Sequence, residues 1–133
     1  MTKVICIVGL PGSGKTKVAN DLCHLHTMIS NNVIVVDDIK SLDQLPAPDE
    51  CDLLIITDPY FCITSTRKTA DAFLKLRYGG EVDWRFFPNE PEKCLLNVEH
   101  RADGRKVFEF IKQLSKVYEP ETVFYKIWQI RSS

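Results

Sequence analysis

Hydrophobic residues form short uninterrupted runs at three places along the chain and gather less uniformly at two more. Runs rich in β-branched residues occupy 4–8, 33–36 and 53–56, and each is four or five residues long. Runs of this kind predict strands that are buried on both faces, as in a parallel sheet. The segments 82–87 and 122–128 are less uniformly apolar but rich in aromatic and β-branched residues, and they predict a fourth and a fifth strand.

Between these runs the apolar positions recur with helical spacing. After Lys15, one stripe is formed by Val18, Leu22, Leu25 and Ile29. The same spacing predicts three further helices, at 64–78, from 91 to about 101, and through 107–118.

The regular alternation of strands and helices predicts an α/β fold with a parallel sheet covered by helices. We expect a three-layer domain around a five-stranded parallel sheet. The chain has 133 residues, of which 44% are hydrophobic, and contains no low-complexity tract or linker. Because domains of about 100–150 residues are common, we expect one domain over residues 1–133.

Composition narrows the class of protein. The 17 basic and 18 acidic residues nearly cancel, so any recognition of an anion has to be local. Five cysteines without a CxxC pair indicate reduced thiols and do not favour a zinc site. No apolar stretch has the length of a signal peptide core or a membrane span, which predicts a cytoplasmic protein, in the host cytoplasm if the protein is viral.

The most specific motif is GLPGSGKT, which directly follows the first apolar run. It matches the phosphate-binding pattern G-x-x-x-x-G-K-S/T, and it lies between a predicted strand and a predicted helix, as that pattern requires. Glycines allow backbone N–H groups to surround an anion, the lysine reaches the β- and γ-phosphates, and the hydroxyl binds Mg²⁺. The predicted cofactors are ATP and Mg²⁺, held by Gly9, Pro11, Gly12, Ser13, Gly14, Lys15 and Thr16.

Other uses of this motif are less compatible with the chain. A glycine-rich turn without a ligand is the simplest alternative. The glycine spacing does not match the G-x-G-x-x-G pattern of dinucleotide-binding domains. A signalling GTPase would carry D-x-x-G after the third strand and N-K-x-D later, whereas this chain has DPYF and no N-K-x-D. An ATP-dependent kinase or a motor ATPase remains, and a motor usually needs a larger chain or partner subunits.

Three aspartates follow predicted strands. Asp37 and Asp38 come after the second strand and Asp58 after the third, so all three are expected beyond the carboxyl edge of the sheet, where ligands bind. We predict that Asp37 is the general base for an attacking hydroxyl, with Asp38 as its rival, and that Asp58 and Thr16 bind Mg²⁺. The alternative for Asp37 and Asp58 is a structural role in a turn.

Cations complete the predicted site. Arg101 and Arg105 flank a break between two predicted helices, and we expect them to stabilise charge on the γ-phosphate, although solvated surface arginines are the alternative. Local cations, Lys40 and Arg67 among them, are candidates for binding the backbone of a nucleic acid substrate. His24 and His26 lie two apart on a helix and are not expected to share a metal.

Four segments of the chain, taken together, resemble the P-loop kinase family that contains the phage polynucleotide kinases. The matching segments are GLPGSGKT, VVDDIK, IITDP and PEKCLLNVEHRADGR, and they span nearly the whole chain. The resemblance implies that Asp37 is the base and that Lys40 binds substrate phosphate, where arginine is typical of the family. The two arginines of the family's lid correspond to Asn97 and Arg101, so Asn97 departs from the pattern and Arg105 becomes a candidate for the missing charge.

The resemblance also suggests a substrate. Nucleoside monophosphate kinases of similar fold insert a helical cap after the second strand, whereas here only SLDQLPAPDECD separates Lys40 from the third strand. An open acceptor side suits a hydroxyl on DNA. In size and motif layout the chain is most similar to the phage 5-hydroxymethyluracil DNA kinases, which phosphorylate the hydroxymethyl group of a base. Tyr60, Phe61 or Trp84 would then stack on that base if it is flipped out of the duplex.

Several functions stay open on the sequence alone. Kinases acting on polynucleotide 5′-hydroxyls and kinases of small nucleosides or metabolites share the same motifs. A non-catalytic ATP-binding module that regulates a partner is a further alternative. DNA is the predicted partner, and neither a membrane nor a stable protein partner is indicated.

Overall fold

The fold was analysed in a computed structural model, which describes residues 1–29, 31–39, 44–99 and 104–127. The strands are β1 (Lys3–Val8), β2 (Val33–Asp37), β3 (Leu53–Thr57) and β4 (Val82–Phe86). The helices are α1 (Lys15–Met28), α2 (Thr64–Tyr78), α3 (Pro91–Val98) and α4 (Gly104–Ser115), with one 3₁₀ turn, η2 (Pro59–Cys62). The predicted alternation of strands and helices is confirmed.

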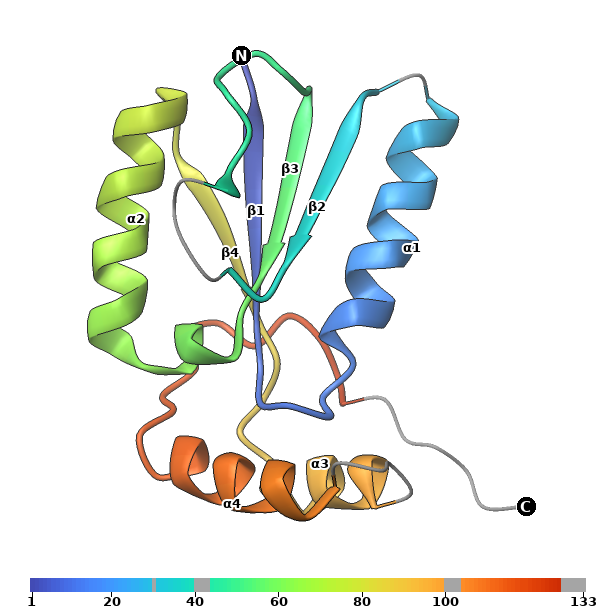
Figure 1. The fold of residues 1–133 in the computed structure, drawn as a ribbon, viewed down its shortest axis with the longest axis vertical. Coiled ribbons are helices and arrows are strands. Elements are labelled where there is room, and N and C mark those ends of the chain that lie inside the picture. The colour runs from blue at the N-terminus through green and yellow to red at the C-terminus, as the bar shows by residue number, and fades with distance from the viewer. Residues whose placement is uncertain (30, 40–43, 100–103, 128–133) are drawn as a thin grey trace.

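All four strands run parallel, in the order β2-β3-β1-β4. Helices α1 and α2 flank the sheet on opposite sides, and α3 and α4 lie together across the end toward which the strands point (Figure 1). The carboxyl ends of the strands and the α3–α4 pair therefore face one another, and ligands of parallel α/β sheets bind at this edge.

The core is centred on the two middle strands. Every residue of β3 is buried, and β1 is buried from Val4 onward. This is the burial expected for uninterrupted apolar runs covered by helices on both faces. The apolar stripe predicted for α1 is only partly buried, because Leu25 and Ile29 are 57% and 63% exposed. None of the described helices combines the length and apolar character needed to cross a membrane.

The predicted fifth strand is wrong for the described residues. The segment after α4 touches the sheet through one isolated parallel bridge between Phe86 and Val123, and Phe124 N and Tyr125 N both donate to the Phe86 carbonyl. No strand ladder extends from that bridge within 104–127. The sheet accordingly has four strands there, where the sequence predicts five.

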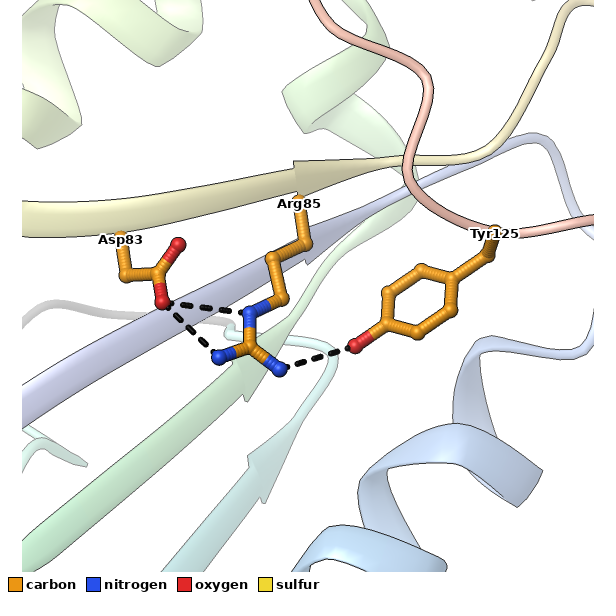
Figure 2. Close-up of polar contacts among 3 residues, drawn as sticks. All are labelled: Asp83, Arg85 and Tyr125. Carbon is orange, nitrogen blue, oxygen red and sulfur yellow. Dashed lines mark hydrogen bonds and ion pairs between the residues drawn. The ribbon is translucent and has the colours of Figure 1, made fainter.

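Side-chain contacts take the place of a ladder in this segment. The Tyr125 hydroxyl accepts a hydrogen bond from Arg85, which is also paired with Asp83 on the same strand (Figure 2). The Arg85 guanidinium lies 5.0 Å from the centre of the Phe124 ring, and the rings of Tyr125 and Phe87 are 5.1 Å apart. The aromatic and β-branched composition that predicts a strand is thus used for packing against the end of β4.

Candidate functional site

A glycine-rich loop joins β1 to α1 at the carboxyl edge of the sheet. Gly12 and Gly14 have φ of 86° and 110°, a left-handed region that glycine enters without a steric penalty. Gly14 is the N-cap of α1, no side chain caps this end, and the first turn carries no acidic residue. The N-terminal N–H groups of a helix without a capping side chain, together with the helix dipole, form a site suited to an anion.

The loop has little space for larger residues. A Cβ at Gly9 would lie 2.5 Å from Ser13 Oγ, and a Cβ at Gly12 would lie 2.6 Å from the carbonyl oxygen of Cys94. Ser13 is fully buried, and its hydroxyl has no hydrogen-bond partner among the described residues. A buried hydroxyl without a partner normally has one in the functional state, so this loop fits the phosphate predicted from the motif.

Lys15 lies beneath this loop. It is 9% exposed, and its Nζ donates to the carbonyls of Gly9 at 2.9 Å and of Leu10 at 3.1 Å. Burial lowers the pKa of Lys15, and the nearby carboxylates of Asp38 and Asp37 oppose this effect. The charged form of a buried ammonium group that is bonded mainly to carbonyls is stabilised by a nearby negative charge, and a bound phosphate would supply that charge.

Asp37 and Asp38 lie at the end of β2, beside the end of β3. Asp37 is paired in register with Thr57, and its carboxylate accepts a hydrogen bond from the Thr57 hydroxyl. Asp38 has a φ of 58°, and its N–H donates to the Thr57 carbonyl at 2.8 Å. Both aspartates are exposed. A solvent-accessible carboxylate oriented by a hydroxyl is chemically able to accept a proton from a substrate.

Asp58 is the buried carboxylate of the group, at 6% exposure. Its Oδ1 accepts a hydrogen bond from Tyr60 N at 2.8 Å and caps η2. Burial raises the pKa of Asp58, and the neighbouring Asp38 adds to this, whereas the hydrogen bond from Tyr60 and the Lys15 ammonium lower it. The Asp58 carboxylate is bonded to the backbone N–H groups of both Tyr60 and Ile39, so the structural role in a turn is present. An ionised carboxylate can accept more than two such bonds, so this role does not exhaust its capacity to bind a cation.

The predicted ligands for Mg²⁺ fit a site that also uses phosphate oxygens. Thr16 is exposed in the first turn of α1, and Asp58 follows β3 at the same edge of the sheet. Among the described residues there is no group of three or more His, Cys, Asp or Glu able to hold a metal alone. Mg²⁺ commonly binds through one or two protein ligands together with substrate phosphates and water, and such a site matches these two residues.

Arg67 lies in the first turn of α2. Its guanidinium donates to the carbonyl of Phe61 at 2.6 Å and to that of Glu119 at 3.2 Å, and it lies over the ring of Phe86. The side chain is 5% exposed and borders a cavity of about 320 Å³ that Lys68 and Trp84 also line. Arg67 therefore joins η2 to the segment after α4, and a role in binding DNA stays a prediction.

The predicted cations Lys40 and Arg101 lie outside the described residues, as does the side chain of Arg105 in α4. One contact of the loop is not apparent from the sequence pattern. The Asn97 side chain of α3 donates to the Gly12 carbonyl at 2.8 Å, across 85 positions of the chain. The asparagine at position 97, where the family resemblance leads one to expect arginine, was the one hint in the sequence of an unusual role. Its contact with Gly12 could not be predicted, because the direction of the side chain depends on how α3 packs.

Comparisons with solved structures agree with this fold. The crystal structure of the protein APE1195 superposes with a TM-score of 0.69 at 16% identity, covering 95% of this chain and 84% of that one. A gluconokinase from Sinorhizobium meliloti 1021 superposes with a TM-score of 0.59 at 13% identity, covering 96% of this chain and 84% of that one. At these identities the likeness concerns the fold, which is an α/β fold resembling that of a P-loop kinase.

No model of a known protein family matches the chain. Among curated proteins, the uncharacterised protein R277 of Acanthamoeba polyphaga mimivirus is 32% identical over 136 residues, which cover 98% of this chain and 96% of that protein. Identity at this level over nearly the full length of both chains indicates common descent and one shared fold. The chain therefore belongs to the same family as this viral protein.

Proposed function

We propose that the protein is an ATP-dependent kinase that transfers the γ-phosphate to a hydroxyl group. The observation that carries this proposal is that two groups follow parallel strands that end at the same edge of the sheet. One is the glycine-rich loop with its buried Lys15, and the other is the exposed Asp37 beside Thr57. Positioning together with charge stabilisation accounts for most of the catalysis in phosphoryl transfer.

Each group has a defined part in the proposed reaction. Backbone N–H groups of the loop and the first turn of α1 bind the phosphates, and Lys15 neutralises charge on the β- and γ-phosphates. Asp37 accepts the proton of the acceptor hydroxyl while the oxygen of that hydroxyl forms a bond to the γ-phosphorus. The bond from that phosphorus to the bridging oxygen of the β-phosphate breaks, and ADP leaves with the electron pair. Mg²⁺, held by Thr16 and Asp58, would neutralise phosphate charge when bound.

We propose DNA as the acceptor, with the hydroxymethyl group of 5-hydroxymethyluracil as the first candidate. The support for a large substrate is the short span of 15 positions between Asp37 and the start of β3, from which we infer an open acceptor side. This span leaves no space for an enclosing helical cap. The viral origin of the related protein is compatible with DNA modification.

The aromatic residues differ in how available they are for a base. Phe61 is 3% exposed and packs edge to face against Trp84, whose indole N–H is bonded to Asp71. Tyr60 is 53% exposed, follows Asp58 closely and lies 5.4 Å from the ring of Phe110. Tyr60 is therefore our candidate for stacking on a base of the acceptor.

The acceptor is tested with labelled ATP and a panel of hydroxyl compounds. The panel contains 5-hydroxymethyluracil DNA, ordinary DNA with a free 5′-hydroxyl, nucleosides and gluconate. We expect label in the modified DNA, and a higher KM for that DNA in Tyr60→Ala. Label confined to the DNA ends would instead support a polynucleotide 5′-kinase. Label confined to nucleosides or gluconate would exclude a polymer substrate.

The catalytic assignment is tested with Asp37→Asn. Removing the base should lower kcat by about 10²- to 10⁴-fold, while the Kd for ATP stays within about twofold of the unmodified protein. Asp38→Asn is the matched comparison, because this neighbouring carboxylate is also exposed and is the rival candidate for the base. If Asp38→Asn loses activity and Asp37→Asn keeps it, the assignment of the base moves to Asp38. ATP binding without label in any acceptor would favour a regulatory module.

A further inference from the structure

Helix α3 rests directly on the glycine-rich loop. A Cβ at Gly12 would lie 2.6 Å from the carbonyl oxygen of Cys94 and 2.9 Å from Cγ1 of Val98. Both α3 residues are fully buried. Because Gly12 also has a φ of 86°, the close approach of α3 and the left-handed backbone both require glycine here.

The loop carbonyls are held from two sides. Lys15 binds those of Gly9 and Leu10 from the α1 side. Asn97 of α3 donates to that of Gly12 at 2.8 Å, and its side chain is 8% exposed. A peptide group is planar, so fixing the Gly12 carbonyl also fixes the direction of the Ser13 N–H. That N–H donates to the Leu10 carbonyl at 3.1 Å, which closes the turn.

We infer that Asn97 is a positioning residue that holds the phosphate loop in its binding conformation before a ligand arrives. A glycine-rich loop loses much conformational freedom when it is ordered, and a loop ordered in advance binds its ligand with a smaller entropic cost. A neutral amide performs this task without adding charge. This inference rests on the proposed nucleotide site and assigns to Asn97 a role in triphosphate affinity.

The inference is tested by removing the Asn97 donor. In Asn97→Leu the side chain keeps a similar volume but has no hydrogen-bonding group. Loss of one hydrogen bond that orders the loop should weaken binding of MgATP and of inorganic tripolyphosphate about 3- to 10-fold each. The KM for ATP should rise by the same factor while kcat changes less than twofold. Asn97→Ala removes the same donor with a smaller side chain, and it serves if Asn97→Leu does not fold.

Asn89 provides a matched control. Its side-chain amide also donates to backbone carbonyls, those of Ser115 at 2.8 Å and Tyr118 at 3.0 Å, next to the end of α4. Asn89→Ala should lower the melting temperature but leave the Kd for tripolyphosphate and the KM for ATP unchanged. A role of Asn97 in stability alone would make the two asparagine variants behave alike.

The outcomes separate this inference from the proposed function. If the unmodified protein binds tripolyphosphate and the folded Asn97 variants bind it equally well, the inference is wrong and the kinase proposal is unaffected. If the variants lose affinity but the unmodified protein phosphorylates no acceptor, the inference holds and the kinase proposal fails. Absence of binding of both tripolyphosphate and MgATP to the unmodified protein would overturn both.

Discussion

At the scale of single residues, Asp58 lies where its charge is costly. The carboxylate is 6% exposed, and burial raises its pKa above the ordinary value of 3.8. Such a group favours folding below pH 3.8, where it is protonated in both states, and loses that contribution as the pH rises through the raised pKa. At neutral pH the ionised Asp58 therefore lowers the stability of the protein, which is compatible with a residue kept for binding a cation.

This cost predicts a stabilising substitution. Asp58→Asn removes the buried charge and keeps an oxygen for the Tyr60 N–H bond, but it loses the acceptor for the bond from Ile39 N, so the expected net gain is small. We expect the melting temperature at pH 7 to rise by about 1–3 °C, with no gain at pH 3. Mg²⁺-dependent affinity for ATP should fall in the same variant. Thermal unfolding at both pH values checks this, and an equal change at the two pH values would contradict the assigned cause.

At the scale of elements, the segment after α4 replaces a strand with a packed loop. Its described part is tied to β4 by two hydrogen bonds to the Phe86 carbonyl and by the contact of Tyr125 with Arg85 (Figure 2). Val123 and Phe124 are 53% and 63% exposed. The segment is therefore anchored by the ring and hydroxyl of Tyr125 and by Ile127, which is buried in the core.

The hydroxyl group and the aromatic ring of Tyr125 are expected to make separate contributions to the free energy of unfolding. Tyr125→Phe loses the bond to Arg85 and should lower the free energy of unfolding by about 0.5–1.5 kcal/mol. Tyr125→Ala also loses the ring contact with Phe87 and should cost about 2–4 kcal/mol. Urea denaturation measures both, with the exposed Glu121→Ala as the control. If Tyr125→Ala is as stable as the control, the segment is not anchored by this ring.

At the scale of the whole molecule, the candidate site unites parts that are far apart in the chain. The loop after β1, the ends of β2 and β3, and α3 all meet at the carboxyl edge of the sheet (Figure 1). A ligand that contacts these parts binds only the folded chain. Its binding free energy therefore adds to the free energy of unfolding.

This coupling predicts a thermal shift that depends on Lys15. MgATP at 100 times its Kd should stabilise the protein by about 2.7 kcal/mol. In Lys15→Met that stabilisation should be lost. Without ligand, the variant removes a buried charge whose pKa is lowered by burial, but it also loses the hydrogen bonds to the carbonyls of Gly9 and Leu10. Because these two effects oppose one another, we expect a small change in the stability of the protein without ligand. Differential scanning fluorimetry with and without MgATP measures both effects, and an undiminished shift in Lys15→Met would place the nucleotide elsewhere.

Local patterns in the sequence were sufficient to predict the alternation of elements and to locate the glycine-rich loop between β1 and α1. Uninterrupted apolar runs specify strands because both faces of β1 and β3 are covered, and the loop is recognisable because its chemistry lies in consecutive residues. The grouping of Asp37 and Asp58 at one edge also follows from the sequence, since parallel strands end at the same edge.

Two features depend on packing between distant segments and were decided only by the tertiary structure: the conformation of the segment 122–127 and the contact of Asn97 with the glycine-rich loop. A β-rich composition at 122–127 does not distinguish a ladder from an aromatic loop, because the same side chains suit both. Asn97 bonds to Gly12 across 85 positions, and only the placement of α3 determines that contact. The sequence by itself thus determined which residues form the candidate phosphate site, and the packing of α3 determined the contact of Asn97 with the Gly12 carbonyl.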